Sequence, residues 1–245
     1  MRAGLLASSL SRRRGIEVLN SCHPFFPTFV RLMSEAAAKP PVYDLGTNRR
    51  FAKEVGLVRY LFNGVDYVAG GFRYDASLGD NACDFHCDLH DLSTIESRIV
   101  GSVICLEVLE HLTAPTKAIS EIHRILKPDG ICVMAVPFLA SYHGKSRRNE
   151  NPVYNASSGF VDDGSHSGYG DYWRFTHEGL ALAFAEAGFR RVDVWPIDGW
   201  LLSRLCLLGL YPLLSKFSWL LKVAGWLDQP RLGRATTLHF VRATK

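Results

Sequence analysis

Two groups of residues, each with an aspartate, lie at the ends of apolar, strand-like runs, and they are suited to binding a polar small ligand. In the first group, Asp44 lies in the run 42–45 and is followed by Gly46 and Asn48. Both of these residues tolerate left-handed backbone. A carboxylate here can accept a hydrogen bond from an ammonium group, and Gly46 allows backbone N–H groups to approach a ligand closely. Taken alone, the group fits an ordinary turn nearly as well.

The second group, Asp88 and Leu89, follows a short strand-like stretch. Its carboxylate can accept from an exocyclic amine, while the leucine packs against an aromatic ring. The alternative is a structural one, in which Asp91 caps a helix and Asp88 is solvated.

Four residues around the second group, Cys83, His86, Cys87 and His90, are of metal-ligand types. Their spacing matches no common zinc pattern, so the sequence favours a strand end and a loop.

The elements that must position these groups alternate between short apolar runs and helix-like stretches. Helices are predicted over 114–127, with isoleucines on one face, and over 176–187, with Thr176 as N-cap. The predicted strands are 42–45, 65–69, 100–106, 130–137, 191–195 and 236–241, with a further short strand before Cys87. This alternation indicates an α/β fold with a mostly parallel, seven-stranded, doubly wound sheet and helices on both faces. Ligands bind such sheets beyond the carboxyl ends of the strands.

The size and charge of the chain limit which domain organisations and which classes of partner are possible. At 245 residues, with a formal charge of +4 and no long basic run, the chain fits one large domain and gives no support for nucleic-acid binding. We expect a core domain over 41–245, preceded by an extension and a leading helix in 1–40. Within the domain, 144–170 is expected to form a lid-like insertion rich in Gly, Ser, Asn and Asp.

Two segments bear on where the protein resides. The N-terminus is rich in Arg and Ser and has no acid before Glu17, which is compatible with a transit peptide or with an untargeted tail. The stretch 200–227 is apolar but interrupted by charges and Pro212, so it should form one or two amphipathic helices that cover the cleft or rest on a membrane surface. We expect a cytoplasmic protein that can contact a membrane peripherally, with a mitochondrial location as the alternative.

The order of several motifs makes the chain similar to a known family. The successive segments VICLEVLEHL, AISEIHRILKPDG and VMAVPF, followed by GDYWRFT and an EG pair, lie in order between residues 103 and 179. This succession resembles the class I S-adenosylmethionine-dependent methyltransferases of type 11, which have a Rossmann-like fold, and in particular a subgroup with a DYWRFT element. The resemblance covers roughly residues 42–189.

The resemblance implies a role for each matching position. Asp44, Gly46 and Asn48 would hold the methionine end of S-adenosyl-L-methionine. The adenine would contact Asp88 and Leu89, and the sulfonium would lie beside Leu106 and Glu107. Gly71 occupies the position where family members carry the ribose-binding acid, so Asp75 is predicted to supply that contact.

On the acceptor side, the resemblance implies that His143 is the general base and that His111, Tyr172 and Arg174 line the pocket. Arg174 would suit an anionic group. Glu107, Glu110 and His111 also resemble a metal-binding E-x-x-E-H pattern of some O-methyltransferases. Relatives without a known metal share that pattern, and we predict no metal.

The predicted function is methyl transfer to an unidentified small-molecule or glycan-type acceptor. The alternative is a catalytically degenerate member that acts as a scaffold, suggested by Gly71 and Asn48. A nicotinamide-dependent oxidoreductase ranks last, because the chain has Gly46 alone where G-x-G-x-x-G is expected.

Overall fold

The computed structural model describes residues 23–47, 58–71, 83–143, 154–155, 159–160, 170–211, 216–228 and 235–245. Three predictions lie wholly or largely outside these residues. They concern the possible transit peptide, the predicted contacts of Asn48 and Asp75, and the insertion 144–170. Of that insertion, the structure describes Gly170 and a two-stranded pair, β6 (Tyr154–Asn155) and β7 (Gly159–Phe160).

One sheet of seven strands forms the centre of the molecule, in the order β3-β2-β1-β4-β5-β9-β8. Strands β1 to β5 pair in parallel, and β9 runs antiparallel to both β5 and β8. The strands are β1 (Val42–Leu45), β2 (Tyr67–Gly71), β3 (Phe85–His86), β4 (Val100–Leu106), β5 (Leu126–Pro137), β8 (Arg191–Pro196) and β9 (Leu238–Thr244). The predicted mostly parallel, seven-stranded sheet is confirmed.

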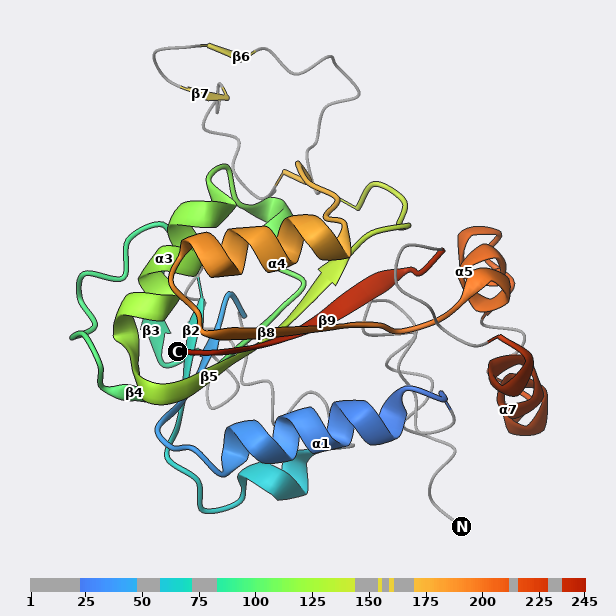
Figure 1. Cartoon of the computed structure of the whole chain (residues 1–245), viewed down its shortest axis with the longest axis horizontal. Helices are drawn as coiled ribbons and strands as arrows, with labels where there is room; N and C mark the ends of the chain where they lie inside the picture. Colours follow the sequence, from blue (N-terminus) through green and yellow to red (C-terminus); the bar gives the residue numbers. More distant parts are fainter. Residues whose placement is uncertain are drawn as a thin grey trace.

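Helices cover both faces of this sheet, as Figure 1 shows. On one face lies α1 (Phe26–Ala37), which buries Phe29, Leu32, Met33 and Ala36 at helical spacing. On the other face lie α3 (Pro115–Ile125) and α4 (His177–Glu186). Because β4 and β5 are covered on both sides, their side chains are buried almost continuously rather than in alternation.

The ends of α3 and α4 test the predicted helix boundaries. The N-cap of α4 is confirmed, since the Thr176 hydroxyl accepts a hydrogen bond from the Gly179 N–H at 3.0 Å. The predicted end of α3 at Lys127 is wrong, because the helix stops at Ile125 and β5 begins at Leu126, which pairs with Val100. The register then shifts, and Asp129 takes a left-handed φ of 61°. Pairing with β4 therefore outweighs the helical periodicity here.

Two further helices follow β8, α5 (Trp200–Leu207) and α7 (Ser218–Leu227). They share a small apolar cluster formed by Leu202, Tyr211, Leu221 and Ala224. Among the helices that the structure describes, none combines the length and the apolar composition needed to cross a membrane. The described residues also include two short 3-10 helices, η2 (Arg59–Phe62) and η4 (Leu109–His111).

Candidate active site

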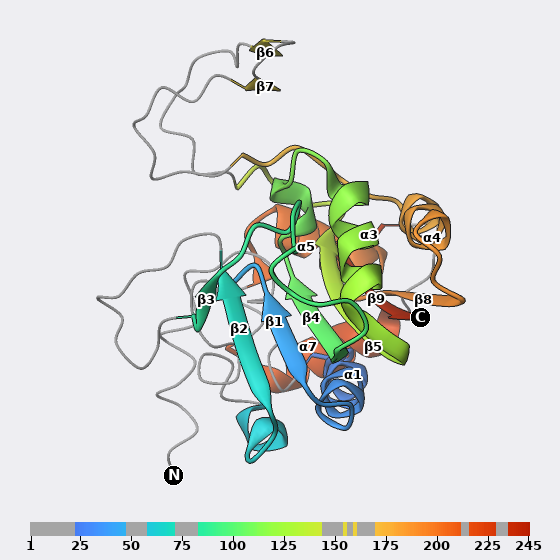
Figure 2. The ribbon, with the colours of Figure 1, turned by 90° about the vertical axis from the view of Figure 1, so that its left-hand side faces the viewer.

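The winding direction of the sheet reverses between β1 and β4, which are neighbours in the sheet but not in the sequence. Figure 2 shows β2, β1 and β4 side by side with their arrowheads at one edge. Asp44 and Leu106 lie at the carboxyl ends of β1 and β4, and Asp88 follows β3 at the same edge. An open α/β sheet binds its ligands at such a switch point.

Asp44 and Gly46 are both set by neighbours in the sheet. The Asp44 side chain is buried, and its Oδ2 accepts a hydrogen bond from the Tyr67 hydroxyl of β2 at 2.5 Å. Gly46 has a φ of +87°, and a Cβ atom there would lie 2.5 Å from Cγ2 of Val108. Both conformation and space therefore require glycine at this turn.

Gly71, where the family resemblance leads us to expect an acid, has no room for any side chain. A Cβ atom on Gly71 would lie 2.0 Å from the carbonyl oxygen of Thr47, in the turn after β1. With this backbone, a ribose-binding acid cannot be placed at the end of β2. The alternative, Asp75, lies outside the described residues.

The predicted adenine-binding pair is held by local contacts. One carboxylate oxygen of Asp88 accepts from the His90 backbone N–H at 2.9 Å and lies 2.8 Å from the ring Nδ1 of His90. Leu89 is buried in the apolar core together with Leu92. The structure thus gives both predicted residues a structural setting, and their contact with adenine stays a prediction.

Leu106 and Glu107 form the turn after β4. Leu106 is half-buried, and Glu107 has a left-handed φ of 56° while its N–H donates to the Ala135 carbonyl at 2.9 Å. A non-glycine residue in this region costs about 1–2 kcal/mol, which packing must offset. Such conformations cluster at functional sites.

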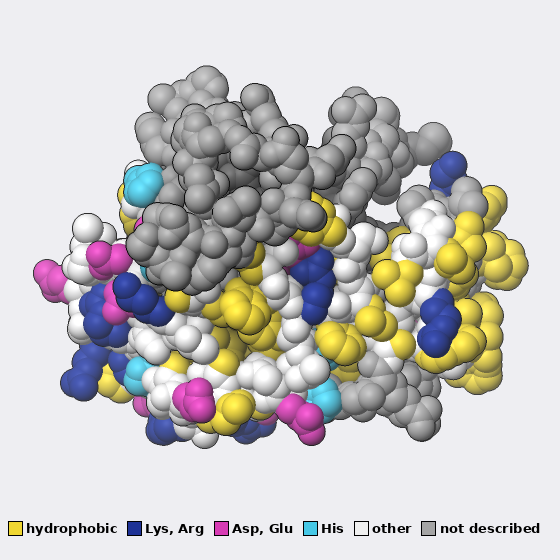
Figure 3. All heavy atoms as spheres, turned by 90° about the horizontal axis from the view of Figure 1, so that it is seen from above, with side chains coloured by type: hydrophobic (Ala, Val, Ile, Leu, Met, Phe, Trp, Pro, Cys, Tyr) yellow, Lys and Arg dark blue, Asp and Glu magenta, His cyan; other side chains and the backbone are white. Residues whose placement is uncertain are grey.

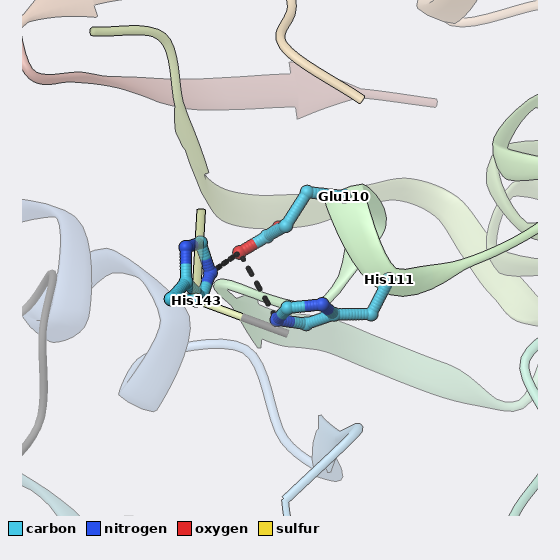
Figure 4. A group of neighbouring side chains, drawn as sticks. All are labelled: Glu110, His111 and His143. Carbon is cyan, nitrogen blue, oxygen red and sulfur yellow. Dashed lines mark hydrogen bonds and ion pairs between the residues drawn. The ribbon is translucent and has the colours of Figure 1, made fainter. Parts of the chain in front are cut away.

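A second group of polar side chains lies after β4 and β5 and is centred on His143, the predicted base. Figure 4 shows His143 and His111 directed toward the carboxylate of Glu110. The distances to Glu110 Oε1 are 3.4 Å from His143 Nε2 and 3.6 Å from His111 Nε2. On its other side, His143 Nδ1 lies 3.4 Å from Asp171 Oδ2, which also accepts from the His143 backbone N–H at 2.9 Å.

The two carboxylates change the proton affinity of His143. The hydrogen bond to Glu110 raises the pKa of His143 above its ordinary value, with further contributions from the Ser141 carbonyl and the charge of Asp171, while burial opposes them. Burial alone would raise the pKa of Asp171. The hydrogen bonds from Arg174 and the His143 backbone nevertheless leave it below its ordinary value. The imidazole is thus oriented by a carboxylate at each of its nitrogens.

Arg174 positions this group instead of facing open space. All five of its guanidinium N–H donors have acceptors within the protein. Two go to Asp171 at 2.5 and 2.7 Å, and the others go to the carbonyls of Ala140, Ser141 and Trp173. This disfavours the predicted direct contact of Arg174 with an anionic acceptor.

His111 and Tyr172 join the segment before α4 to η4. His111 Nδ1 lies 2.5 Å from the Gly170 carbonyl oxygen, and the Tyr172 N–H donates to the Glu110 carbonyl at 2.8 Å. The Tyr172 ring is partly exposed. His111 therefore lies beside the predicted base, while the acceptor contact of Tyr172 stays a prediction.

Sequence reasoning gave Glu110 no separate role and missed Asp171. Both side chains are fully buried, and Glu110 Oε2 has no hydrogen-bond partner among the described residues. The available signal was local, since each residue adjoins a predicted site residue, His111 or Tyr172. Glu110, His111 and His143 also place one ligand atom each within 4.8 Å of one another, a set able to hold a metal ion.

The buried thiols near the site are not nucleophiles. Burial, with the charges of Cys132, Asp44 and Glu110 adding to it, raises the pKa of Cys105 well above its ordinary value, and burial raises that of Cys87 to about 12. Both sulfurs therefore stay protonated, as small packing groups do.

A comparison of the sequence with protein families identifies the domain. Residues 46–134, which include the turn after β1, β4, Glu110 and most of β5, match the family model described as a methyltransferase domain. This part of the chain is therefore similar to a methyltransferase domain. No curated protein sequence matches the chain significantly.

Solved structures share the fold of this methyltransferase domain at low sequence identity. A SAM-dependent methyltransferase from Archaeoglobus fulgidus is 12% identical, covers 100% of both chains and has a TM-score of 0.56. An S-adenosylmethionine-dependent methyltransferase from Mesorhizobium loti is 13% identical over 90% of this chain and 97% of its own, with a TM-score of 0.51. Phosphoethanolamine N-methyltransferase 2 of Haemonchus contortus, in complex with S-adenosyl-L-methionine, is 13% identical and has a TM-score of 0.50. It covers 100% of this chain, which spans 58% of that protein.

The described part of the methyltransferase site suits the methionine end of S-adenosyl-L-methionine, the methyl donor of this class. Asp44 offers a buried carboxylate to an ammonium group, and the turn at Gly46 brings backbone beside it. Leu106 and Glu107 lie on the adjacent strand end, where the resemblance places the sulfonium. The ribose end depends on residues outside the described ranges.

Proposed function

We propose that this methyltransferase transfers a methyl group to a hydroxyl or amine of a small-molecule or glycan-type acceptor, with His143 as general base. The observation that supports the proposal is the position of His143 between the buried carboxylates of Glu110 and Asp171. The Ser141 carbonyl at 3.2 Å and Asp171 at 3.4 Å both face Nδ1, so they fix the ring and favour the tautomer that leaves Nε2 as the basic nitrogen. An acceptor that carries a removable proton needs such a base.

S-adenosyl-L-methionine, when bound, supplies an electrophilic methyl carbon on a positively charged sulfur. The protein aligns the acceptor and removes its proton. Neutral His143 would take the acceptor's proton at Nε2, beside Glu110, while Nδ1 keeps its own proton toward the Ser141 carbonyl and Asp171. Glu110 stabilises the imidazolium formed, and its Oε2 can accept a hydrogen bond from the acceptor.

Asp171 and Arg174 act through His143. Asp171 holds the backbone and the ring of His143, and Arg174 binds Asp171 through two hydrogen bonds while it also binds the loop carbonyls of Ala140 and Ser141. The loop after β5 is thereby tied to the segment before α4. Both residues are positioning residues for the base.

The proposal is tested with purified protein, S-adenosyl-L-methionine and a panel of phenols, alcohols and amines, by measuring S-adenosylhomocysteine and methylated product. With an accepted substrate, His143→Gln should lower kcat by about 10²–10⁴-fold. Wild-type kcat should rise with pH through the raised pKa of His143, because only the neutral imidazole accepts a proton. His177→Gln, at the start of α4, is the matched control and should retain full activity.

A chelator separates the proposed base from a metal ligand. The Arg174 guanidinium pairs with Asp171, and the rings of His143 and His111 face Glu110, so both carboxylates already have partners within the protein. We therefore expect activity to be unchanged after EDTA treatment. Loss of activity on chelation, or full activity of His143→Gln, would contradict the assignment of His143.

The match to a methyltransferase domain favours methyl transfer over the scaffold alternative. The glycine at position 71 had suggested degeneration, but the close approach of Thr47 leaves no room for a Cβ atom there, which gives a structural reason for glycine. Binding of S-adenosyl-L-methionine by the wild-type protein separates the two hypotheses, since a scaffold without a cofactor site would show none.

A further inference from the structure

Helices α5 and α7 each expose a row of large side chains, mostly apolar, to the solvent, and we call each row an apolar stripe. The spacing of each stripe is that of helix residues which normally face a core. On α7 the exposed residues are Trp219, Lys222, Val223, Trp226 and Leu227, and on α5 and the turn after it they are Trp200, Arg204, Leu207 and Leu208. Trp226 is 75% exposed and Leu208 is 71% exposed, which places the stripes on the outside of the molecule.

The opposite faces of the two helices are packed. Leu202 of α5 and Leu221 of α7 are buried in their shared cluster, and Gly225 lies so close to Pro24 that a Cβ atom would be 1.9 Å from its Cγ. At the end of α7, Asp228 accepts hydrogen bonds from the backbone N–H groups of Leu201 and Leu202 at 2.8 and 2.6 Å. Helices α5 and α7 are therefore packed against each other, and α7 also packs against Pro24. The apolar stripes lie on the sides of the helices that face away from these contacts.

The charges that accompany these stripes are positive. Arg204, Lys216 and Lys222 are exposed, and the Arg204 guanidinium lies over the Trp200 ring, 4.1 Å from its centroid. From residue 200 to the C-terminus the sequence contains one acid, Asp228, which is buried at the N-terminus of α5. Figure 3 shows hydrophobic side chains gathered with a cationic one at the end of the molecule where α5 and α7 lie in Figure 1.

We propose that α5 and α7 dock the protein on an anionic lipid surface, with both helices lying in the plane of the interface. Tryptophan is enriched where hydrocarbon meets water, and Lys and Arg beside it attract anionic headgroups. An exposed stripe that is apolar, rich in tryptophan and accompanied only by cations complements such a surface in both composition and charge. This proposal does not depend on the identity of the methyl acceptor.

Co-sedimentation of the full chain with vesicles tests the proposal. The protein should bind phosphatidylcholine vesicles that contain phosphatidylserine more tightly than phosphatidylcholine alone, and added salt should weaken this binding. The double variant Trp219→Glu/Trp226→Glu, called the tryptophan variant, should abolish co-sedimentation. Lys216→Gln and Lys222→Gln should each weaken binding to the anionic vesicles about fivefold.

Leu182→Glu on α4 is the matched control, because Leu182 is an exposed apolar residue on a different helix, at 60% against 62% for Trp219. It should bind vesicles like the wild type. Equal vesicle binding by the tryptophan variant, or no binding by the wild type, would overturn the proposal. So would gel filtration showing a wild-type dimer that the tryptophan variant converts to a monomer, because a second copy would then cover the face. If the tryptophan variant does not fold, the two lysine variants decide the question.

Discussion

At the scale of single residues, buried carboxylates lie near the ends of two neighbouring strands, Asp44 in the last part of β1 and Glu110 after β4. A buried carboxylate is costly unless hydrogen bonds or positive charge offset its desolvation. The Tyr67 hydroxyl contributes to this at Asp44, and two imidazoles approach Glu110. Their separate partners suggest separate tasks, with Asp44 toward the methyl donor and Glu110 toward the acceptor.

Asp44→Asn should weaken binding of S-adenosyl-L-methionine about 10- to 100-fold, because a neutral amide replaces a charged acceptor worth roughly 1.5–3 kcal/mol. Isothermal titration calorimetry measures the change in Kd. Tyr67→Phe removes one hydrogen-bond donor to Asp44 but keeps the carboxylate, so it should cost less. An unchanged Kd in Asp44→Asn would place the donor's ammonium group elsewhere.

At the scale of elements, the contact between the ends of β1 and β2 determines which residues can serve the site. Gly46 N–H donates to the Gly70 carbonyl at 2.8 Å, and Gly71 lies against Thr47. The two strand ends are therefore closer than a side chain at position 71 would permit. The packing between these two elements therefore gives a structural reason for glycine at this position.

Gly71→Asp, which restores the residue type that family members carry, should destabilise the protein instead of strengthening ribose binding. Forcing atoms into this packed contact costs at least about 1–3 kcal/mol. Urea denaturation should show a lower midpoint. Gly64→Asn is the control, since Gly64 has open space around it and asparagine tolerates its left-handed φ of +74°. A Gly71→Asp protein of wild-type stability would show that Thr47 moves away freely.

At the scale of the whole molecule, buried ionisable groups control how global stability depends on pH. Burial, and secondarily the charge of His177, lowers the pKa of His239 from 6.5 to about 4, and burial does the same for His23. As pH falls from 6.5 to 4, these histidines become protonated in the unfolded chain but stay neutral in the folded protein. The unfolded state is thereby favoured, and stability is lost. Asp198 acts in the opposite sense. Burial raises its pKa from 3.8 to about 6, and the folded state gains stability as pH falls through that range.

His239→Gln should therefore make the loss of stability between pH 7 and pH 4 shallower, by roughly 3 kcal/mol if the whole shift is removed. The measurement is the free energy of unfolding in urea across this range. His86→Gln changes an exposed histidine and should leave the wild-type slope in place. An unchanged slope in His239→Gln would mean that the folded protein accommodates a proton on His239.

Hydrophobic periodicity determined much of this fold, because a buried parallel strand and an amphipathic helix must each repeat apolar residues at their own spacing. The strands at 42–45 and 100–106 and a last strand near the C-terminus were predictable on that basis, and the Thr176 N-cap was predictable from its residue type. So was the edge of the sheet at which Asp44, Asp88 and Leu106 lie, since parallel strands end together.

Contacts between residues far apart in the sequence were decided only by the tertiary structure. Periodicity does not reveal that Glu110, His143 and Asp171 meet, that Arg174 uses all its donors internally, or that Thr47 fills the space beside Gly71. Nor does it reveal that α5 and α7 turn their apolar stripes outward. A local pattern records which residues share a face of an element, whereas what that face meets depends on how all the elements pack together.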